Sequence, residues 1–402
     1  MPTLDELTWL ASADGRAVCR EMDQEYPADS PAHIAHWRER LEPGRVAVAW
    51  GQVLLRRQAR HKFAQADGML LDRVGLEQAT DEIVAAHKAR RFEGLARVAD
   101  LCCGIGGDAL ALAATTRVTA VDWSEPRTFM TRHNASAYGR QVETLAEDVA
   151  FCRPEVDAIH IDPDRRPGGP RRHEPEAGSP NLEILRQIVG HYAHAAIKLS
   201  PGADFGSLGI NAEIELIGLA GECKQAVAWT GRFQQAYRRA TVLPGGESIA
   251  ATATDDLAWP ASQPVEPGAW LFEPDAAVIR ADLVGRLARK SDLAPIDPLI
   301  AYLVGSTPVF SGLLRAFRVL EVADFSAAAV RRLLKRHEVG LLEIKSRGFA
   351  CRPEEIRRWA RPKGRRAGTL ILTRIAGRPR AILAERPEPA CGSPCNACSL
   401  PL

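Results

Sequence analysis

The sequence predicts an α/β protein with a doubly wound, largely parallel sheet, a helical amino-terminal region and a small carboxy-terminal α+β domain. Three observations predict this class. Short apolar runs alternate with helical segments between about residues 93 and 246, a glycine-rich turn follows the first run, and a basic segment with strand and helix patterns fills residues 311–385. Strands that alternate with helices form a parallel sheet covered by helices on both faces.

Composition excludes several classes of protein. Hydrophobic residues make up 46% and charged residues 25% of the 402 residues, which is typical of a globular protein with two or three domains. No apolar run approaches the ~18–20 residues that a membrane helix needs, and the first ten residues lack the basic region of a secretory signal. Nine cysteines, with Cys102 and Cys103 adjacent, indicate a reducing compartment. We therefore expect a cytoplasmic protein without a membrane span.

The charge is distributed unevenly along the chain. The net charge is only +2, yet residues 311–380 contain 18 Lys and Arg residues and 6 Asp and Glu residues. A basic module therefore follows an acidic body. This asymmetry suggests a polyanionic partner.

The elements are predicted in chain order from their periodicity. Residues 4–92 are predicted to be helical, and the stretch 75–92 has apolar side chains near the helical period and no Gly or Pro after its first residue. Buried strands and intervening helices follow. The strands are predicted at 97–103, 118–123, 157–163 and 193–201, the helices at 109–116 and 181–193, and two closing strands at 212–221 and 224–231.

The chain divides into five predicted regions. These are a helical region (1–92), the sheet domain (93–246), a connecting region with some helix (247–310), the basic α+β domain (311–385) and a Pro/Cys-rich tail (386–402). In the tail, Cys391, Cys395 and Cys398 have a spacing that iron–sulfur or zinc sites also use. A flexible, thiol-bearing tail is the interpretation we favour, and no metal site is predicted.

The most informative stretch is the glycine turn that follows the first strand, at residues 100–108. Gly104, Gly106 and Ala109 match the dinucleotide pattern, with Asp122 at a suitable distance for a ribose. Asp100, however, would repel a pyrophosphate and attract a ligand with an ammonium and a sulfonium group. The sequence therefore favours a cationic cofactor over a nicotinamide.

Four motifs in order resemble the class I S-adenosylmethionine-dependent methyltransferases. They are the glycine turn, Asp122 after the second strand, Asp148 after the third, and Asp162-Pro163 after the fourth. A narrower set of segments resembles the bacterial methyltransferases that carry a THUMP-like domain. These segments are 59–63, 69–92, 162–166, 198–202 and about 311–385. The resemblance implies a Rossmann-like methyltransferase sheet, S-adenosyl-L-methionine as cofactor, and RNA as partner.

The resemblance also implies roles for individual acids in cofactor binding. Asp100 would hold the methionine ammonium group, Asp122 the ribose hydroxyls and Asp148 the adenine amino group, each as an ionised acceptor. A helix-capping role for Asp122 is the alternative, but Ser124 is expected at that N-cap. The expected cofactor-binding residues are Asp100, Cys102, Gly104, Gly106, Gly107, Asp122, Trp123 and Asp148.

The expected catalytic residues are Asp162 and Pro163, which would orient the methyl acceptor. Asp164 and Arg165 follow where amino methyltransferases usually have a proline and an aromatic residue. Lys198, inside an apolar strand, is expected to pair with an acid, with extension to the strand end beside the cofactor as the alternative. Gln78 and Thr80 belong to the resembling segment, and we interpret them as polar residues on a helix surface, with a cover over the substrate pocket as the alternative. Six arginines are expected to bind substrate, namely Arg165, Arg166, Arg357, Arg358, Arg365 and Arg366.

These expectations combine into one hypothesis with two alternatives. The protein is expected to be a methyltransferase that acts on structured RNA such as tRNA or rRNA, with a base nitrogen as a candidate acceptor. Aromatic residues in the basic domain are few, so recognition through the RNA backbone and shape is expected. The alternatives are a methyltransferase that acts on a protein or small molecule, and a non-catalytic RNA-binding protein with a methyltransferase fold.

Overall fold

The computed structural model describes residues 1–25, 31–163 and 180–387. The chain divides into two compact units. The first consists of Met1–Ile214 and Gln225–Gln235, and the second of Glu215–Lys224 and Ala236–Leu402. Within the described part of the chain, no helix is both long and apolar enough to cross a membrane. The tail cysteines Cys391, Cys395 and Cys398 lie outside the described residues.

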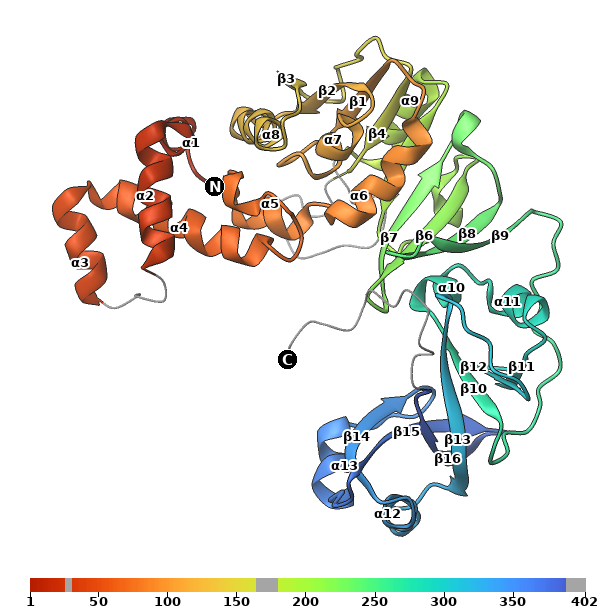
Figure 1. Ribbon diagram of the computed structural model, residues 1–402. Helices are drawn as coiled ribbons and strands as arrows, with labels where there is room; N and C mark the ends of the chain where they lie inside the picture. Colours follow the sequence, from red (N-terminus) through yellow and green to blue (C-terminus); the bar gives the residue numbers. More distant parts are fainter. Residues whose placement is uncertain (26–30, 164–179, 388–402) are drawn as a thin grey trace. The chain divides into compact units, whose positions relative to one another are not determined.

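The first unit begins with helices, as predicted (Figure 1). Thr3 and Glu6 form a capping box at the first helix, and Ser12 caps the second. The helices are α1 (Leu4–Ala11), α2 (Ala13–Gln24), α3 (Pro31–Arg40) and α4 (Pro43–Ala59).

The stretch 75–92, which was predicted to be helical, is not one continuous helix. The chain instead forms α5 (Arg73–Gln78), α6 (Glu82–Ala89) and a 3₁₀ turn, η2 (Arg90–Phe92). The break occurs because Asp81 accepts a hydrogen bond from the Ile83 backbone and so becomes the N-cap of α6. Because the apolar periodicity continues across the break, the capping residue Asp81 indicates the start of α6 better than the periodicity does.

A sheet with strand order β3-β2-β1-β4-β5-β7 forms the body of the first unit. The neighbouring strands are parallel except β5 and β7, which are antiparallel. The chain order reverses between β1 and β4, and ligands of such sheets bind at the carboxyl ends of the strands near this point. The strands are β1 (Arg97–Leu101), β2 (Arg117–Asp122), β3 (Val142–Ala146), β4 (Ala158–Ile161), β5 (Ala195–Leu199) and β7 (Glu222–Trp229).

Three helices connect these strands, and they agree with the predicted alternation. Pro126 lies in the first turn of the second of them, and Asn181 caps the third through the Ile184 backbone. The helices are α7 (Gly107–Leu112), α8 (Glu125–Ala137) and α9 (Leu182–His191). The chain passes to the second unit within β6 (Glu213–Leu219) and returns to the first within β7.

The second unit contains the hairpin of β8 (Arg238–Leu243) and β9 (Glu247–Ala251), and a sheet with strand order β11-β12-β10-β13-β16-β15-β14. Its last six elements are, in order, a strand, a helix, a strand, a helix and two strands, which agrees with the strand and helix patterns predicted for residues 311–385. These are β13 (Leu314–Asp324), α12 (Ala327–Arg336), β14 (Val339–Ser346), α13 (Pro353–Ala360), β15 (Arg366–Ile375) and β16 (Arg378–Glu385).

The interpretation of 247–310 as a connecting region does not agree with the strand pairing. Leu271 is fully buried and lies opposite Phe317 of β13, so this stretch completes the sheet of the basic domain. The sequence of this stretch resembles a linker because its short apolar segments pair with strands that are distant in the chain. Besides β9, the stretch forms β10 (Trp270–Pro274), α10 (Ala276–Arg280), α11 (Val284–Lys290), β11 (Ala294–Asp297) and β12 (Ile300–Gly305).

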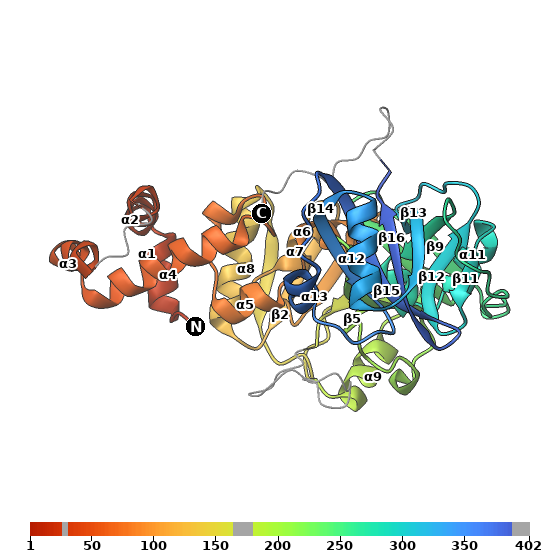
Figure 2. The same cartoon turned by 90° about the horizontal axis from the view of Figure 1, so that it is seen from below.

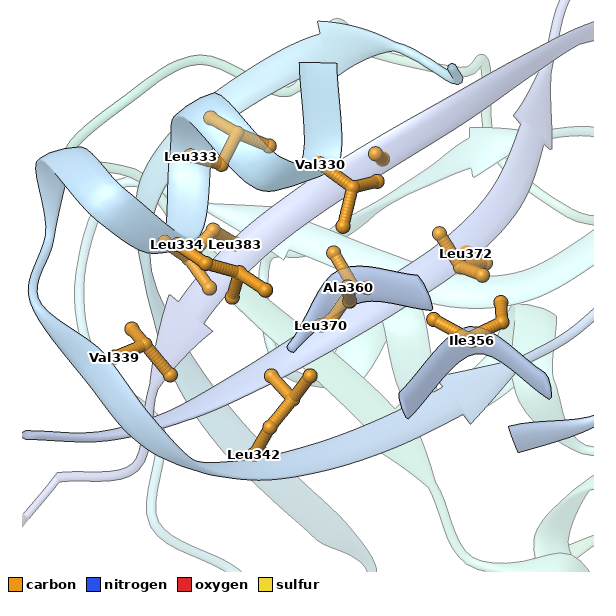
Figure 3. Close-up of a cluster of buried hydrophobic side chains, with 11 residues drawn as sticks. Val330, Leu333, Leu334, Val339, Leu342, Ile356, Ala360, Leu370, Leu372 and Leu383 are labelled. Carbon is orange, nitrogen blue, oxygen red and sulfur yellow. The ribbon is translucent and has the colours of Figure 1, made fainter. Parts of the chain in front are cut away.

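Helices α12 and α13 cover one face of the strands β14, β15 and β16 (Figure 2). Figure 3 shows Val330 and Leu334 of α12 and Ile356 of α13 gathered with Leu370 and Leu383 of the strands. Both helices are amphipathic, so burying this apolar side leaves their charged side in solvent. The exposed basic residues of α12 are Arg331, Arg332, Lys335 and Arg336.

Leu383→Ala is expected to lower the free energy of unfolding by about 2–5 kcal/mol, because the side chain is fully buried and its loss leaves a cavity. Leu341→Ala is the matched control, since Leu341 is 72% exposed and should change stability by less than about 0.5 kcal/mol. Urea denaturation of the full chain measures both. Equal effects of the two variants would contradict the assigned core.

Candidate functional site

The glycine turn between β1 and α7 has a backbone that only particular residues adopt. Gly104 and Gly106 have φ values of 59° and 93°, and Cys102 has a φ of 61°. A Cβ atom at Gly104 would meet no heavy atom within 4 Å, so a ligand can approach the backbone there. At Gly107 a Cβ atom would lie 3.1 Å from the backbone nitrogen of Thr80. Gly104 therefore leaves one side of the turn open to a ligand, and Gly107 allows the Thr80 backbone to approach closely.

Asp122 ends β2 and ties the turn to the next helix. It is buried, its Oδ2 accepts a hydrogen bond from the Gly104 backbone, and its Oδ1 accepts one from the Ser124 backbone, both at 3.0 Å. Ser124 occupies the N-cap position of α8 but its own side chain makes no capping bond. Burial raises the pKa of Asp122. A carboxylate has about four lone-pair sites, so both oxygens can still accept hydrogen bonds from a ligand.

Two exposed aromatic side chains flank the carboxyl ends of β2 and β3. Trp123, directly after Asp122, is 76% exposed, and Phe151 is 88% exposed. Asp148 lies in the same loop as Phe151 and accepts a hydrogen bond from the Ala150 backbone at 2.8 Å. Phe151 was not predicted from the sequence, although an aromatic residue three positions after the candidate ligand Asp148 was a usable signal.

A buried network of charged and polar side chains lies directly behind the glycine turn. Asp100 Oδ1 and His160 Nδ1 are 2.7 Å apart, His160 Nε2 is 3.1 Å from Lys88 Nζ, and Lys88 Nζ is 2.6 Å from Asp108 Oδ1. The Thr80 hydroxyl donates to Asp108 Oδ2 at 2.6 Å. The network therefore joins α6 to β1, β4 and the start of α7 (Figure 1).

Burial and paired charge act in opposite directions within this network. Burial raises the pKa of Asp100, although its contact with His160 opposes that shift. Burial also acts to raise the pKa of Asp108. Attraction by nearby positive groups, above all by the Lys88 ammonium group, is stronger in total, and it holds the pKa of Asp108 well below its usual range. The second oxygen of Asp100, Oδ2, is buried and has no hydrogen-bond partner among the residues that the structure describes. Asp100 therefore retains one free acceptor.

Lys88, Asp108 and His160 were not predicted as site residues. His160 is a titratable side chain inside an apolar strand, and that was the available signal. The interpretation of Thr80 as a helix-surface residue is wrong, because Thr80 is buried and bonded to Asp108. Local periodicity could not show this, since the partner lies 28 residues away.

Asp162 and Lys198 form a pair at the ends of β4 and β5. Lys198 Nζ is 2.5 Å from Asp162 Oδ2 and donates to the Gln78 carbonyl at 3.0 Å, so the predicted pairing of Lys198 with an acid is confirmed. Asp162 Oδ1 has no partner within the described ranges, and the Asp162 side chain is 25% exposed. Pro163 is buried beside it. Arg165 and Arg166 lie outside the described residues.

The segment around α5 closes the site from the amino-terminal side. A Cβ atom at Gly75 would overlap the Ile105 side chain, so α5 packs directly on the glycine turn. Gln78 bonds to Lys198, and Thr80 bonds to Asp108. The segment that contains α5 is therefore part of the candidate site, together with the glycine turn.

Four of the six predicted substrate-binding arginines lie in the basic domain, and they differ in their contacts. Arg357 donates to the Leu342 carbonyl at 3.2 Å, and Arg366 pairs with Glu385 at 3.1 Å. Arg358 and Arg365 are exposed and have no ion pair with other residues in the described part of the chain. These two side chains are the ones available to an anion.

The arrangement fits a cationic ligand with an adenosine part. Asp100 offers a buried, unpartnered carboxylate oxygen, and Gly104 leaves open space beside the turn. Asp122 and Asp148 offer further acceptors, and Trp123 offers an exposed ring for an aromatic base. Burial raises the pKa of the Cys102 thiol well above its usual value, so this neighbour stays protonated and neutral.

Comparison with known proteins gives matches along most of the chain. Residues 314–386 match the family model described as THUMP domain-like, residues 95–154 match RNA cap guanine-N2 methyltransferase, and residues 3–59 match a domain of unknown function. In two strains of Mycobacterium tuberculosis, an uncharacterized S-adenosylmethionine-dependent methyltransferase is 34% identical to this chain over 336 residues. The match covers 80% of this chain and 91% of each relative.

A solved structure from Porphyromonas gingivalis W83, described as a methyltransferase, has the same fold. It superimposes with a TM-score of 0.77 over 94% of this chain and 99% of that chain, at 20% sequence identity. The similarity therefore extends through the helical region, the sheet and the basic domain.

Lys88→Met is expected to lower the free energy of unfolding by about 3–5 kcal/mol, because it leaves the Asp108 carboxylate buried without its cation. Lys224→Met is the matched control, since Lys224 and Glu222 form an exposed pair worth less than about 1 kcal/mol. The double variant Lys88→Met/Asp108→Leu should recover part of the loss. If Lys88→Met matched the control in urea denaturation, the buried pair would not be a structural requirement.

Proposed function

Because this chain belongs to the family of S-adenosylmethionine-dependent methyltransferases, we propose that it methylates structured RNA, with a base nitrogen of tRNA or rRNA as the candidate acceptor. The family assignment rests on 34% identity across 91% of the curated relatives. The observation that carries the RNA proposal is the exposed basic side of α12 and α13, in the domain that matches the THUMP domain-like model. The match of residues 95–154 to a model named for RNA cap guanine-N2 methyltransferase supports it.

The cofactor-binding residues follow from the free acceptors at the carboxyl edge of the sheet. Asp100 Oδ2 would accept from the ammonium group, Asp122 from the ribose hydroxyls and Asp148 from the adenine amino group. Trp123 would stack on the adenine ring. When bound, the cofactor supplies a methyl group on a positively charged sulfur, which an electron pair on the acceptor can attack in line.

Asp162 would orient the acceptor. Lys198 holds its Oδ2, which leaves Oδ1 to accept a hydrogen bond from an amino group of the substrate. The Pro163 carbonyl would provide a second acceptor at the same strand end. Because Lys198 is also bonded to the Gln78 carbonyl, the carboxylate is fixed from both the sheet and α5.

The basic domain would bind the RNA backbone. Arg358 and Arg365 are exposed and unpaired within the described residues, so their guanidinium groups are available to phosphates. The domain's aromatic residues are engaged in packing. Phe317 is fully buried, and the Phe325 and Phe349 rings are 4.7 Å apart against the core. Recognition by shape and backbone is therefore proposed over stacking of unpaired bases.

Transfer of labelled methyl groups from S-adenosylmethionine to total RNA from a strain without this gene tests the proposal. Label is expected in that RNA and not in RNA from the parent strain, whose sites are already methylated. Asp162→Asn should reduce the rate by about 100-fold, because the acceptor loses its orientation. Glu155→Gln, which removes an exposed carboxylate before β4, should stay within about twofold.

Digestion of the labelled RNA to nucleosides then identifies the methylated atom. No label in RNA, with S-adenosylmethionine bound normally, would contradict the RNA proposal and favour a protein or small-molecule acceptor. Full activity of Asp162→Asn would contradict the proposed role of Asp162 and would leave the RNA proposal unaffected.

Arg358→Gln/Arg365→Gln is expected to weaken RNA binding and to make it less dependent on salt. The slope of log affinity against log salt is negative, and the loss of two phosphate contacts should reduce its magnitude by about 1.4–1.8. Arg20→Gln/Lys290→Gln, which changes the charge equally at exposed positions on α2 and α11, should leave the slope unchanged. Filter binding of tRNA at several salt concentrations measures both, and equal slopes for both variants would contradict a specific role of the basic domain.

A further inference from the structure

We propose that His160 is a positioning residue for cofactor binding: with its ring fixed by Lys88, it holds Asp100 so that the free carboxylate oxygen faces the ammonium group of the cofactor's amino-acid part. This inference rests on the proposed role of Asp100. It adds a second layer to the site, in which His160 and Lys88 act through Asp100 without touching the ligand.

The strand register places the two side chains together. Asp100 of β1 and His160 of β4 are direct partners in a parallel pair, and each is only 1% exposed. Asp100 Oδ1 lies 2.7 Å from His160 Nδ1. One carboxylate oxygen is therefore held by the neighbouring strand, and the other, Oδ2, is buried without a partner among the residues described.

The contact with Lys88 decides which ring nitrogen carries the hydrogen. Lys88 Nζ is 3.1 Å from His160 Nε2 and 2.6 Å from Asp108 Oδ1, where it forms an ion pair. An ammonium group can only donate, so Nε2 must accept from it. The hydrogen of the neutral ring is then on Nδ1, which donates to Asp100. Lys88 thus sets the tautomer, and the tautomer sets the orientation of the Asp100 carboxylate.

The charges of this group explain why the remaining position suits a cation. Asp100 and Asp108 are two carboxylates, Lys88 is one cation, and His160 is neutral in the required tautomer. Asp108 is paired with Lys88 and also accepts from the Thr80 hydroxyl. The uncompensated negative charge therefore lies on Asp100. A buried charge without a partner is costly, and an ammonium group at Oδ2 would remove that cost.

Binding of two neutral-sulfur ligands separates this role from a general structural one. S-adenosylhomocysteine carries the amino-acid part, and 5′-methylthioadenosine lacks it, while both contain the same adenosine thioether. His160→Leu removes the donor to Asp100. We expect it to weaken S-adenosylhomocysteine binding by about 10-fold or more and to leave 5′-methylthioadenosine binding within about twofold, as measured by calorimetry on the full chain.

Two conservative variants sharpen the test. The amide nitrogen of His160→Asn can replace Nδ1, so this variant should restore S-adenosylhomocysteine affinity to within about threefold of the parent protein. His160→Gln can reach Lys88 but loses the donor to Asp100, so it should show the same ligand-selective loss as His160→Leu. It replaces His160→Leu if that variant does not fold.

The outcomes distinguish this inference from the proposed function. Equal weakening of both ligands by His160→Leu or His160→Gln would assign His160 a structural role and overturn the inference. Asp100→Asn serves as the reference. If it weakens only S-adenosylhomocysteine while the His160 variants do not, the inference fails and the role of Asp100 stands. If Asp100→Asn affects both ligands equally, the proposed role of Asp100 fails as well.

Discussion

The ion pair between the Lys88 ammonium group and the Asp108 carboxylate, 2.6 Å long and almost fully buried, is the interaction on which the rest of the site depends. It fixes α6 against the first turn of α7, directly after the glycine turn. Two buried charges are stable only as a pair, so the helical region cannot move away from the sheet without exposing or isolating one of them. Helix α6 is for this reason a structural part of the sheet domain.

The same pair organises the polar groups on either side of it. Lys88 also contacts His160, which links the pair to Asp100, and Asp108 also accepts from Thr80, which fixes the break between α5 and α6. On the other side of β4, Lys198 repeats this arrangement with Asp162 and the Gln78 carbonyl. Lys88 contacts Asp108 and His160, and Lys198 contacts Asp162 and the Gln78 carbonyl. Asp162 is therefore held by a lysine directly, and Asp100 is linked to Lys88 through His160.

In the second unit, the two sides of α12 and α13 have different roles. The apolar sides of α12 and α13 build the core with β15 and β16, and their basic sides remain in solvent. Because Phe325, Phe349 and Trp359 pack against this core, the surface around α12 and α13 offers charge and few stacking platforms. This division supports binding through phosphates.

The sequence by itself determined the local features of this protein. The glycine turn, the acids after the strands, the Asp162-Pro163 motif and the basic carboxy-terminal domain are all visible in short stretches, because each depends on residues close together in the chain. Tertiary structure decided the rest. Lys88 and Asp100 meet His160 across 72 and 60 residues, and β10 pairs with β13 across a stretch that resembles a linker. Periodicity carries no information on such pairs, since burial and charge compensation arise only when distant segments pack together.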